Sequence, residues 1–165
     1  VYQSFILESK KWDDYVIAQS FMFYAIFSVI TLFIAGPIVD KLTSRKILPL
    51  MNIPSLFAML ILFYFDHYMS SYFLLGLMGI SNGLANVLGS STWAEIYGVK
   101  YIGSIKALTT SMMVFSTAFG TAIFGMIIDF GYSIEVIAMT SFFYMAVANV
   151  LIVVFKRRIQ PILIK

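Results

Sequence analysis

The sequence predicts an all-α integral membrane protein, a bundle of five transmembrane helices preceded by a short N-terminal helix stub. Three observations lead to this fold class. Hydrophobic residues make up 61% of the 165 residues and charged residues only 12%, whereas roughly 25% of a typical soluble domain is charged. Five apolar runs are long enough for a helix to cross the hydrocarbon core, which takes about 20 residues. Nine of the eleven Lys and Arg residues lie at alternate junctions between those runs.

The five runs must be helical, because the bilayer core offers no partner for a free backbone N–H or C=O. β-Hairpins are excluded, since the runs are too long and their side chains do not alternate in polarity. The interiors of the runs contain no Asp, Glu, Lys, Arg or His. Residues 1–7 form an apolar stub that we interpret as the outer end of a further helix. The predicted spans are 15–39, 47–65, 72–93, 105–128 and 136–155, within one domain of residues 1–165.

The distribution of basic residues predicts the orientation of the spans, since Lys and Arg concentrate in cytoplasmic loops. The segments 40–46 and 94–106 and the C-terminal tail hold most of them, whereas only Lys10 and Lys11 lie at the opposite junctions. We therefore expect both segments and the C-terminus to be cytoplasmic. The basic residues form no broad face, so the net charge of +3 does not indicate nucleic-acid binding.

The first two spans differ in polarity. The first carries Gln19 and Tyr24, which we regard as candidates for a substrate pathway. The second contains Pro49 and Pro54, and proline removes a backbone hydrogen bond and kinks a helix. These prolines either shape the bundle or form a moving hinge.

The third span carries amide side chains on one face and glycines on another. Asn82 and Asn86 are four residues apart and so share a face, with Trp93 near it. Gly79 and Gly83 form a small-xxx-small pair on an adjacent face, which predicts a close contact with another helix.

Polar side chains inside the spans support two interpretations. They could bond across a dry bundle as interhelical contacts, or they could line a hydrated substrate pathway. For the scattered Ser and Thr residues of the fourth span we favour a bond to the carbonyl four residues earlier. The distribution of polar residues predicts that spans one, three and four line the pathway and that spans two and five face lipid.

The segment Gly36–Lys46, GPIVDKLTSRK, is the most charged part of the chain. A glycine near a helix end allows another helix to approach closely. Asp40 is placed to meet the positive N-terminus of a neighbouring helix. Arg45 and Lys46 belong in the headgroup region, and Glu95 is a candidate partner for Arg45.

This segment resembles the cytoplasmic signature loop of the major facilitator superfamily, a Gly-xxx-Asp followed by basic residues. The matching residues are Gly36, Asp40, Lys41, Arg45 and Lys46, with Lys41 in place of the more usual Arg. The resemblance implies the C-terminal half of that family's fold, with the spans as helices eight to twelve and the stub as the end of helix seven. It also implies that the loop latches one half against the other in the outward-facing state, with Asp40 against a helix of the N-terminal half. A topology signal alone is the alternative interpretation.

The resemblance implies part of a secondary active transporter that moves a small solute by alternating access. Its partners would be the lipid bilayer, the missing N-terminal half and a small-molecule substrate, in a prokaryotic inner membrane. The alternative is a small non-transporting membrane protein that anchors or assembles other proteins.

The arrangements of residues that are typical of enzyme active sites and metal sites are missing from the sequence. There is no cysteine, no HExxH spacing, no pair of carboxylates within a span and no nucleophile with a nearby base. We therefore expect no enzyme activity, no metal and no cofactor.

Overall fold

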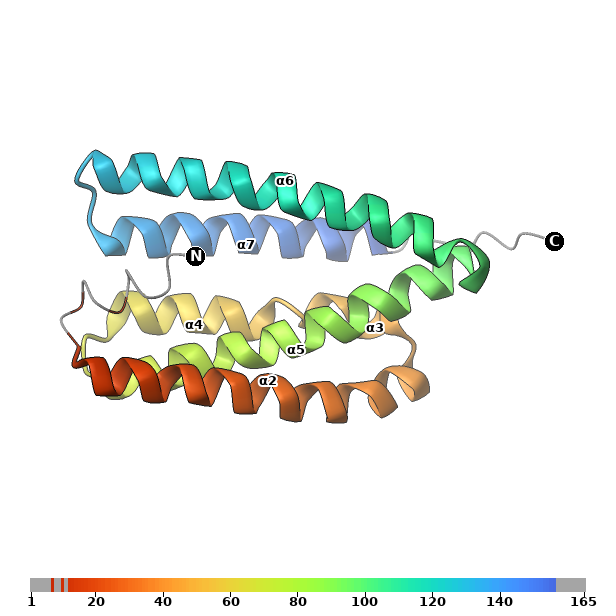
Figure 1. Ribbon diagram of the computed structural model, residues 1–165, viewed down its shortest axis with the longest axis horizontal. Helices are drawn as coiled ribbons and strands as arrows, with labels where there is room; N and C mark the ends of the chain where they lie inside the picture. The colour runs from red at the N-terminus through yellow and green to blue at the C-terminus, as the bar shows by residue number, and fades with distance from the viewer. Residues whose placement is uncertain (1–6, 8–9, 11, 157–165) are drawn as a thin grey trace.

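The computed structural model describes residues 7, 10 and 12–156, and these form a bundle of long helices with no strand among them (Figure 1). Lys11, most of the stub 1–7 and the basic residues Arg157, Arg158 and Lys165 lie outside the described residues. The elements are α2 (Asp14–Leu42), α3 (Ser44–Ile47), the 3-10 turn η1 (Leu48–Leu50), α4 (Ile53–Tyr64), α5 (Met69–Tyr97), the 3-10 turn η2 (Val99–Tyr101), α6 (Ile102–Asp129) and α7 (Ile134–Lys156).

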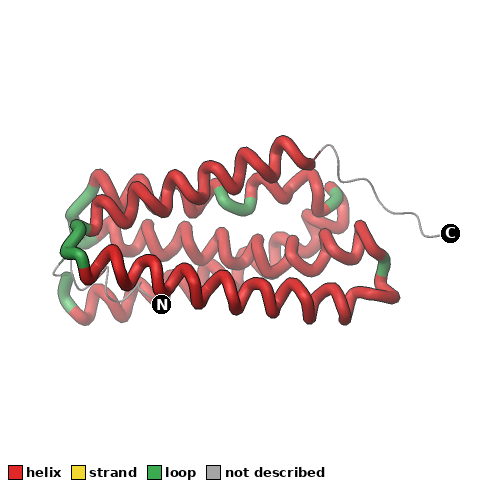
Figure 2. Tube along the Cα trace, turned by 90° about the horizontal axis from the view of Figure 1, so that it is seen from above, coloured by secondary structure: helices red, strands yellow, loops and turns green. Residues whose placement is uncertain are grey.

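Five segments are long and apolar enough to cross a membrane, which confirms the predicted fold class. Seen from above, they run along one common axis and are joined at the two ends of the bundle by short loops (Figure 2). They are Asp14–Leu42, Ser44–Tyr64, Met69–Tyr97, Val99–Asp129 and Glu135–Phe155. The helices continue past most of the predicted span limits, because polar interface residues are also helical.

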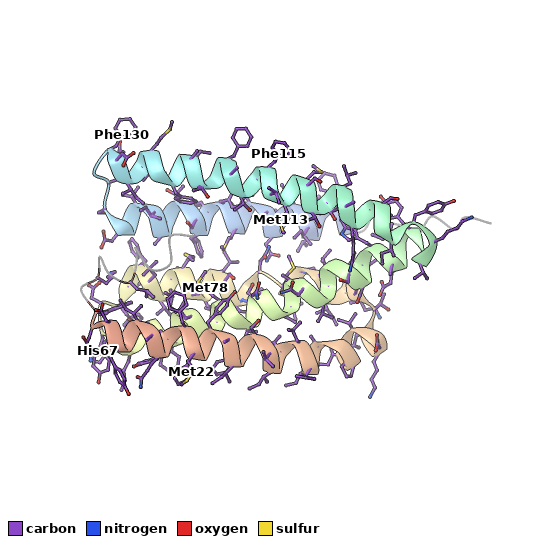
Figure 3. All side chains as sticks on the ribbon, in the orientation of Figure 1. Met22, His67, Met78, Met113, Phe115 and Phe130 are labelled. Atoms are coloured by element: carbon purple, nitrogen blue, oxygen red, sulfur yellow. The ribbon has the colours of Figure 1, made fainter. Side chains whose placement is uncertain are left out.

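Packing is uneven across the bundle. α2 packs along α5, α5 packs on α4, and α4 packs on α7. α6 lies with α7 on the opposite side of the bundle from α2 (Figure 1). None of the residues of α6, all of which are described, is buried. The large side chains of Phe115 on α6 and of Phe130 directly after it extend away from the other helices (Figure 3).

The second span is interrupted, as its prolines predict. Pro49 lies in the first turn of η1 and Pro54 in the first turn of α4, positions where a missing N–H does no harm. The break divides the span into α3, η1 and α4. The Ser81 hydroxyl of α5 donates a hydrogen bond of 2.5 Å to the carbonyl of Met51 inside the break.

The predicted close contact at Gly79 and Gly83 is confirmed, and the helix they meet is α2. A Cβ at Gly83 would lie 2.8 Å from the carbonyl oxygen of Ser28, and one at Gly79 would collide with that of Tyr24. The two glycines therefore let the backbones of α2 and α5 touch. This contact fixes how α2 is rotated against α5.

One end of the bundle is closed by charged side chains. Lys10 pairs with Asp66 in the α4–α5 loop and lies 3.9 Å from Glu135 at the start of α7. The Trp12 indole N–H donates to the backbone carbonyl of Asp66 at 3.0 Å. Beneath them, the fully buried Leu7 belongs to the main apolar core, which α4, α5 and α7 complete. The segment before α2 is thus attached to three later elements.

Candidate pathway residues and charged loop

Polar side chains join α2 to α5 within the membrane-spanning region. The Tyr72 hydroxyl donates to Gln19 Oε1 at 2.7 Å. Further along, Asn82 Nδ2 donates to Ser28 Oγ at 3.2 Å. Both bonds run between the two helices, which is what the interpretation as interhelical contacts requires of Gln19 and Asn82.

A third polar contact between α2 and α5 is fully buried. Ser20 Oγ and Ser71 Oγ share a hydrogen bond of 2.8 Å, and neither side chain is exposed. Each hydroxyl has one hydrogen, so one serine donates to the other, and the second donates to a backbone carbonyl, that of Val16 for Ser20 or that of Tyr68 for Ser71. Buried polar groups of this kind fix the register between two helices, because any slip would leave them unpaired.

Tyr24 points toward the protein core. It is half-buried and packs against the main apolar core with Ile17 and Phe21, while its backbone touches Gly79. The contact between the α2 and α5 backbones sets this orientation.

Asn86 and Trp93 lie further along α5. The side chain of Asn86 is exposed and donates to the carbonyl of Asn82 at 2.9 Å, within its own helix. The Trp93 ring is 5.9 Å from the ring of Tyr97 and inclined to it by 32°. Neither residue contacts Gln19 or Tyr24 in any described interaction.

The five pathway candidates therefore do not converge on one cavity. Two make α2–α5 hydrogen bonds, one packs into the core and two lie on α5 beyond the bonded region. The five are Gln19, Tyr24, Asn82, Asn86 and Trp93. Their role in a substrate pathway stays a prediction.

A cavity between α2 and α5 is lined by aromatic residues that the sequence analysis did not single out. It measures about 270 Å³, and its walls include Phe23, Phe27, Tyr72 and Phe73. One signal was present in the sequence, since Phe23 and Phe27 are four residues apart and so share a helix face. The pairing of α2 with α5, which brings the two faces together, could not be read from that spacing.

Four of the seven Ser and Thr residues of α6 follow the predicted pattern, each donating to the carbonyl four residues earlier at 2.8–2.9 Å. Bonds of this kind leave the hydroxyls compatible with lipid as well as with protein. The residues are Thr109, Ser111, Thr117 and Thr121.

The charged loop is held to α5 by Glu95. One carboxylate oxygen, Oε1, accepts a hydrogen bond of 2.8 Å from the backbone N–H of Ser44, the first residue of α3. The other, Oε2, lies 3.9 Å from Arg45 Nε. The pairing expected of Arg45 and Glu95 is thus present, and Glu95 in addition caps the short helix α3.

The turn before α3 has unusual backbone and side-chain features. Thr43 has φ 72° and ψ 131°, a conformation that glycine adopts easily and a β-branched residue does not. Among the described residues, Ser44 Oγ and Thr92 Oγ1 are buried without a hydrogen-bond partner. Thr92 lies one turn before Glu95 on α5, so the docking of this turn involves strain and unpaired polar groups.

The remaining charged residues of the loop face outward. Asp40, Lys41 and Lys46 are exposed. A Cβ at Gly36 would meet no atom within 4 Å, so no described helix makes the close approach expected at this glycine.

Comparison with known proteins decides the family. The family model described as Major Facilitator Superfamily matches residues 1–162. The chain belongs to the major facilitator superfamily. The comparisons with curated proteins and with solved structures give no match. Membership confirms the resemblance seen in the charged loop, and it makes the chain a transporter-type integral membrane protein.

Membership of the major facilitator superfamily does not by itself assign a role to any of these residues. Among the described residues, no group of three or more His, Cys, Asp or Glu side chains could hold a metal ion. The arrangement consists of polar contacts between α2 and α5 and a charged loop docked at one end of α5. The latch role of the loop stays a prediction.

Proposed function

We propose that the chain is the C-terminal part of a secondary active transporter that moves a small solute by alternating access. Residues 1–165 would form a partial C-terminal helical domain, with α2, α5 and α6 lining the pathway. The family match over residues 1–162 carries the proposal.

The partner we propose is an N-terminal half of the same transporter. In many transporters of this kind, substrate binds near the bilayer midplane between repeats that rock against each other. α6 is 28 residues long and has no buried residue, so it leaves a long exposed face available to such a half. We propose that the end of the bundle that carries Asp40 faces the cytoplasm of a prokaryotic cell, because the basic residues Lys41, Arg45 and Lys46 lie there.

The test is an uptake screen with the full-length protein in sealed vesicles, with and without a proton gradient. We expect at least one small solute to accumulate above the level in empty vesicles. We expect the isolated 165-residue chain, reconstituted in the same way, not to transport. Failure of the full-length protein on a broad panel of solutes would favour a non-transporting membrane protein instead.

A further inference from the structure

The cavity between α2 and α5 lies in the first half of both helices, on the two spans expected to line the pathway. Its volume is about 270 Å³. An apolar cavity of about 150 Å³ is sufficient to bind benzene. The cavity therefore has room for a molecule of one or two rings. Its lining includes Phe23, Phe27, Tyr72, Phe73, Gly76 and Ile80.

The aromatic walls are arranged in pairs. The rings of Phe23 and Phe27 have centroids 6.3 Å apart and planes inclined by 24°. The rings of Phe23 and Tyr72 are 5.2 Å apart and inclined by 57°. These spacings fall within the range in which aromatic rings attract each other beyond simple burial. Gly76 keeps the space open, because a Cβ there would lie 3.4 Å from the Phe27 ring.

The lining is almost free of polar groups. None of the described residues that line the cavity is charged, and the Tyr72 hydroxyl donates its hydrogen to Gln19. A charged ligand would lose its hydration here without compensation. Water would find too few partners to remain. Both considerations restrict the occupant to an uncharged apolar molecule.

We propose that this cavity binds an uncharged planar molecule with one or two aromatic rings. Ring faces on the walls favour a flat aromatic ligand over a lipid acyl chain, because only the ring gains the offset and edge contacts. This inference rests on the proposed function, because it takes the molecule bound in the cavity to belong to the class of substrate that is transported.

Phe73 lies at the boundary of the cavity on the side of the loop before α5. A second cavity of about 320 Å³ lies between the end of α4 and the start of α5, with His67 and Met69 in its lining. Phe73 belongs to the walls of both cavities, and its side chain is 66% exposed. A ring compound that enters from this side would have to pass the Phe73 side chain.

The experiment is photolabelling of the full-length protein in lipid nanodiscs with a phenyl diazirine, followed by mass spectrometry of the labelled residues. We expect labelling at Phe23, Tyr72 or Phe73 to saturate with probe concentration. We also expect naphthalene to displace it and oleic acid not to. Labelling that rises linearly like that of bulk lipid, or that oleic acid displaces equally well, would overturn the proposal.

Two variants with matched controls test the location. Gly76→Ala narrows the cavity by one methyl group, while Gly89→Ala adds the same group on α5 in open space. Phe73→Ala removes an exposed wall, while Phe115→Ala removes a ring of 68% exposure from α6. We expect the two cavity variants to bind the probe about fivefold more weakly and the controls to bind it as the wild type does. Wild-type binding by both cavity variants would contradict the proposal.

The photolabelling experiment and the uptake screen test the two proposals separately, because either can fail while the other succeeds. Saturable labelling without uptake of any solute would retain the aromatic site and remove the transporter proposal. Uptake of a solute without saturable labelling would retain the transporter proposal and remove the aromatic site.

Discussion

The carboxylate of Glu95 on α5 accepts a hydrogen bond from the backbone N–H of Ser44, within the charged loop. The first N–H groups of a helix have no partner within it, and a side-chain acceptor commonly satisfies one of them. Here the acceptor comes from another helix, more than 50 residues away. The loop between α2 and α4 is therefore positioned by α5 as well as by its own sequence.

Replacing Glu95 should separate its two interactions. Glu95→Ala removes the acceptor for the Ser44 N–H and the partner of Arg45, and we expect a loss of about 1–2 kcal/mol of stability. Glu95→Gln keeps an acceptor oxygen and loses only the charge, so its loss should be less than half as large, since an ion pair of this exposure contributes little. Thermal unfolding of the full-length protein in detergent measures both. Equal losses would show that the charge, and not the cap, holds the loop.

Thr43 is expected to be a site of stored strain. Its φ of 72° disfavours any residue with a Cβ, and most of all a β-branched one. Thr43→Gly should therefore stabilise the protein by about 1 kcal/mol, after allowing for the greater freedom of glycine in the unfolded chain. Thr43→Ala retains the Cβ and serves as the control, with a much smaller gain expected. The same unfolding assay applies, and a destabilised Thr43→Gly protein would show that the turn is not strained.

The glycine contact between α2 and α5 should tolerate no added methyl group. Gly79→Ala and Gly83→Ala each place a Cβ against the backbone of α2, and we expect each to cost about 1–3 kcal/mol. Gly89→Ala lies on the same helix with nothing near it, and it should be neutral or stabilising, because alanine favours helix by roughly 1 kcal/mol over glycine. Unfolding temperatures in detergent would distinguish the two sites. Similar values for all three variants would argue against a close helix contact.

The sequence predicted those properties that depend on local composition and spacing. The apolar runs predicted the spans, the prolines predicted the interrupted second span, and the spacing of Gly79 and Gly83 predicted a close helix contact. The partner of each side chain depends instead on how two distant helices are rotated against each other. For this reason Tyr24, a pathway candidate by composition, packs into the core. The aromatic cavity likewise needs Phe23 and Tyr72 to meet across two helices, and spacing within either helix says nothing about that.

Asp40 provides the sharpest test of the proposed alternating access. Its side chain is exposed at the end of α2, and the neighbouring Gly36 has open space around it, so both can meet a helix of an N-terminal half. A latch of this kind would bias the equilibrium between outward- and inward-facing states without touching the substrate. Asp40→Asn in the full-length protein should therefore change the maximal transport rate severalfold and the apparent substrate affinity by much less. The matched control is Asp14→Asn, an exposed acid at the opposite end of α2, for which we expect wild-type rates. If Asp40→Asn expresses normally and transports at the wild-type rate, the charged loop is a topology signal alone.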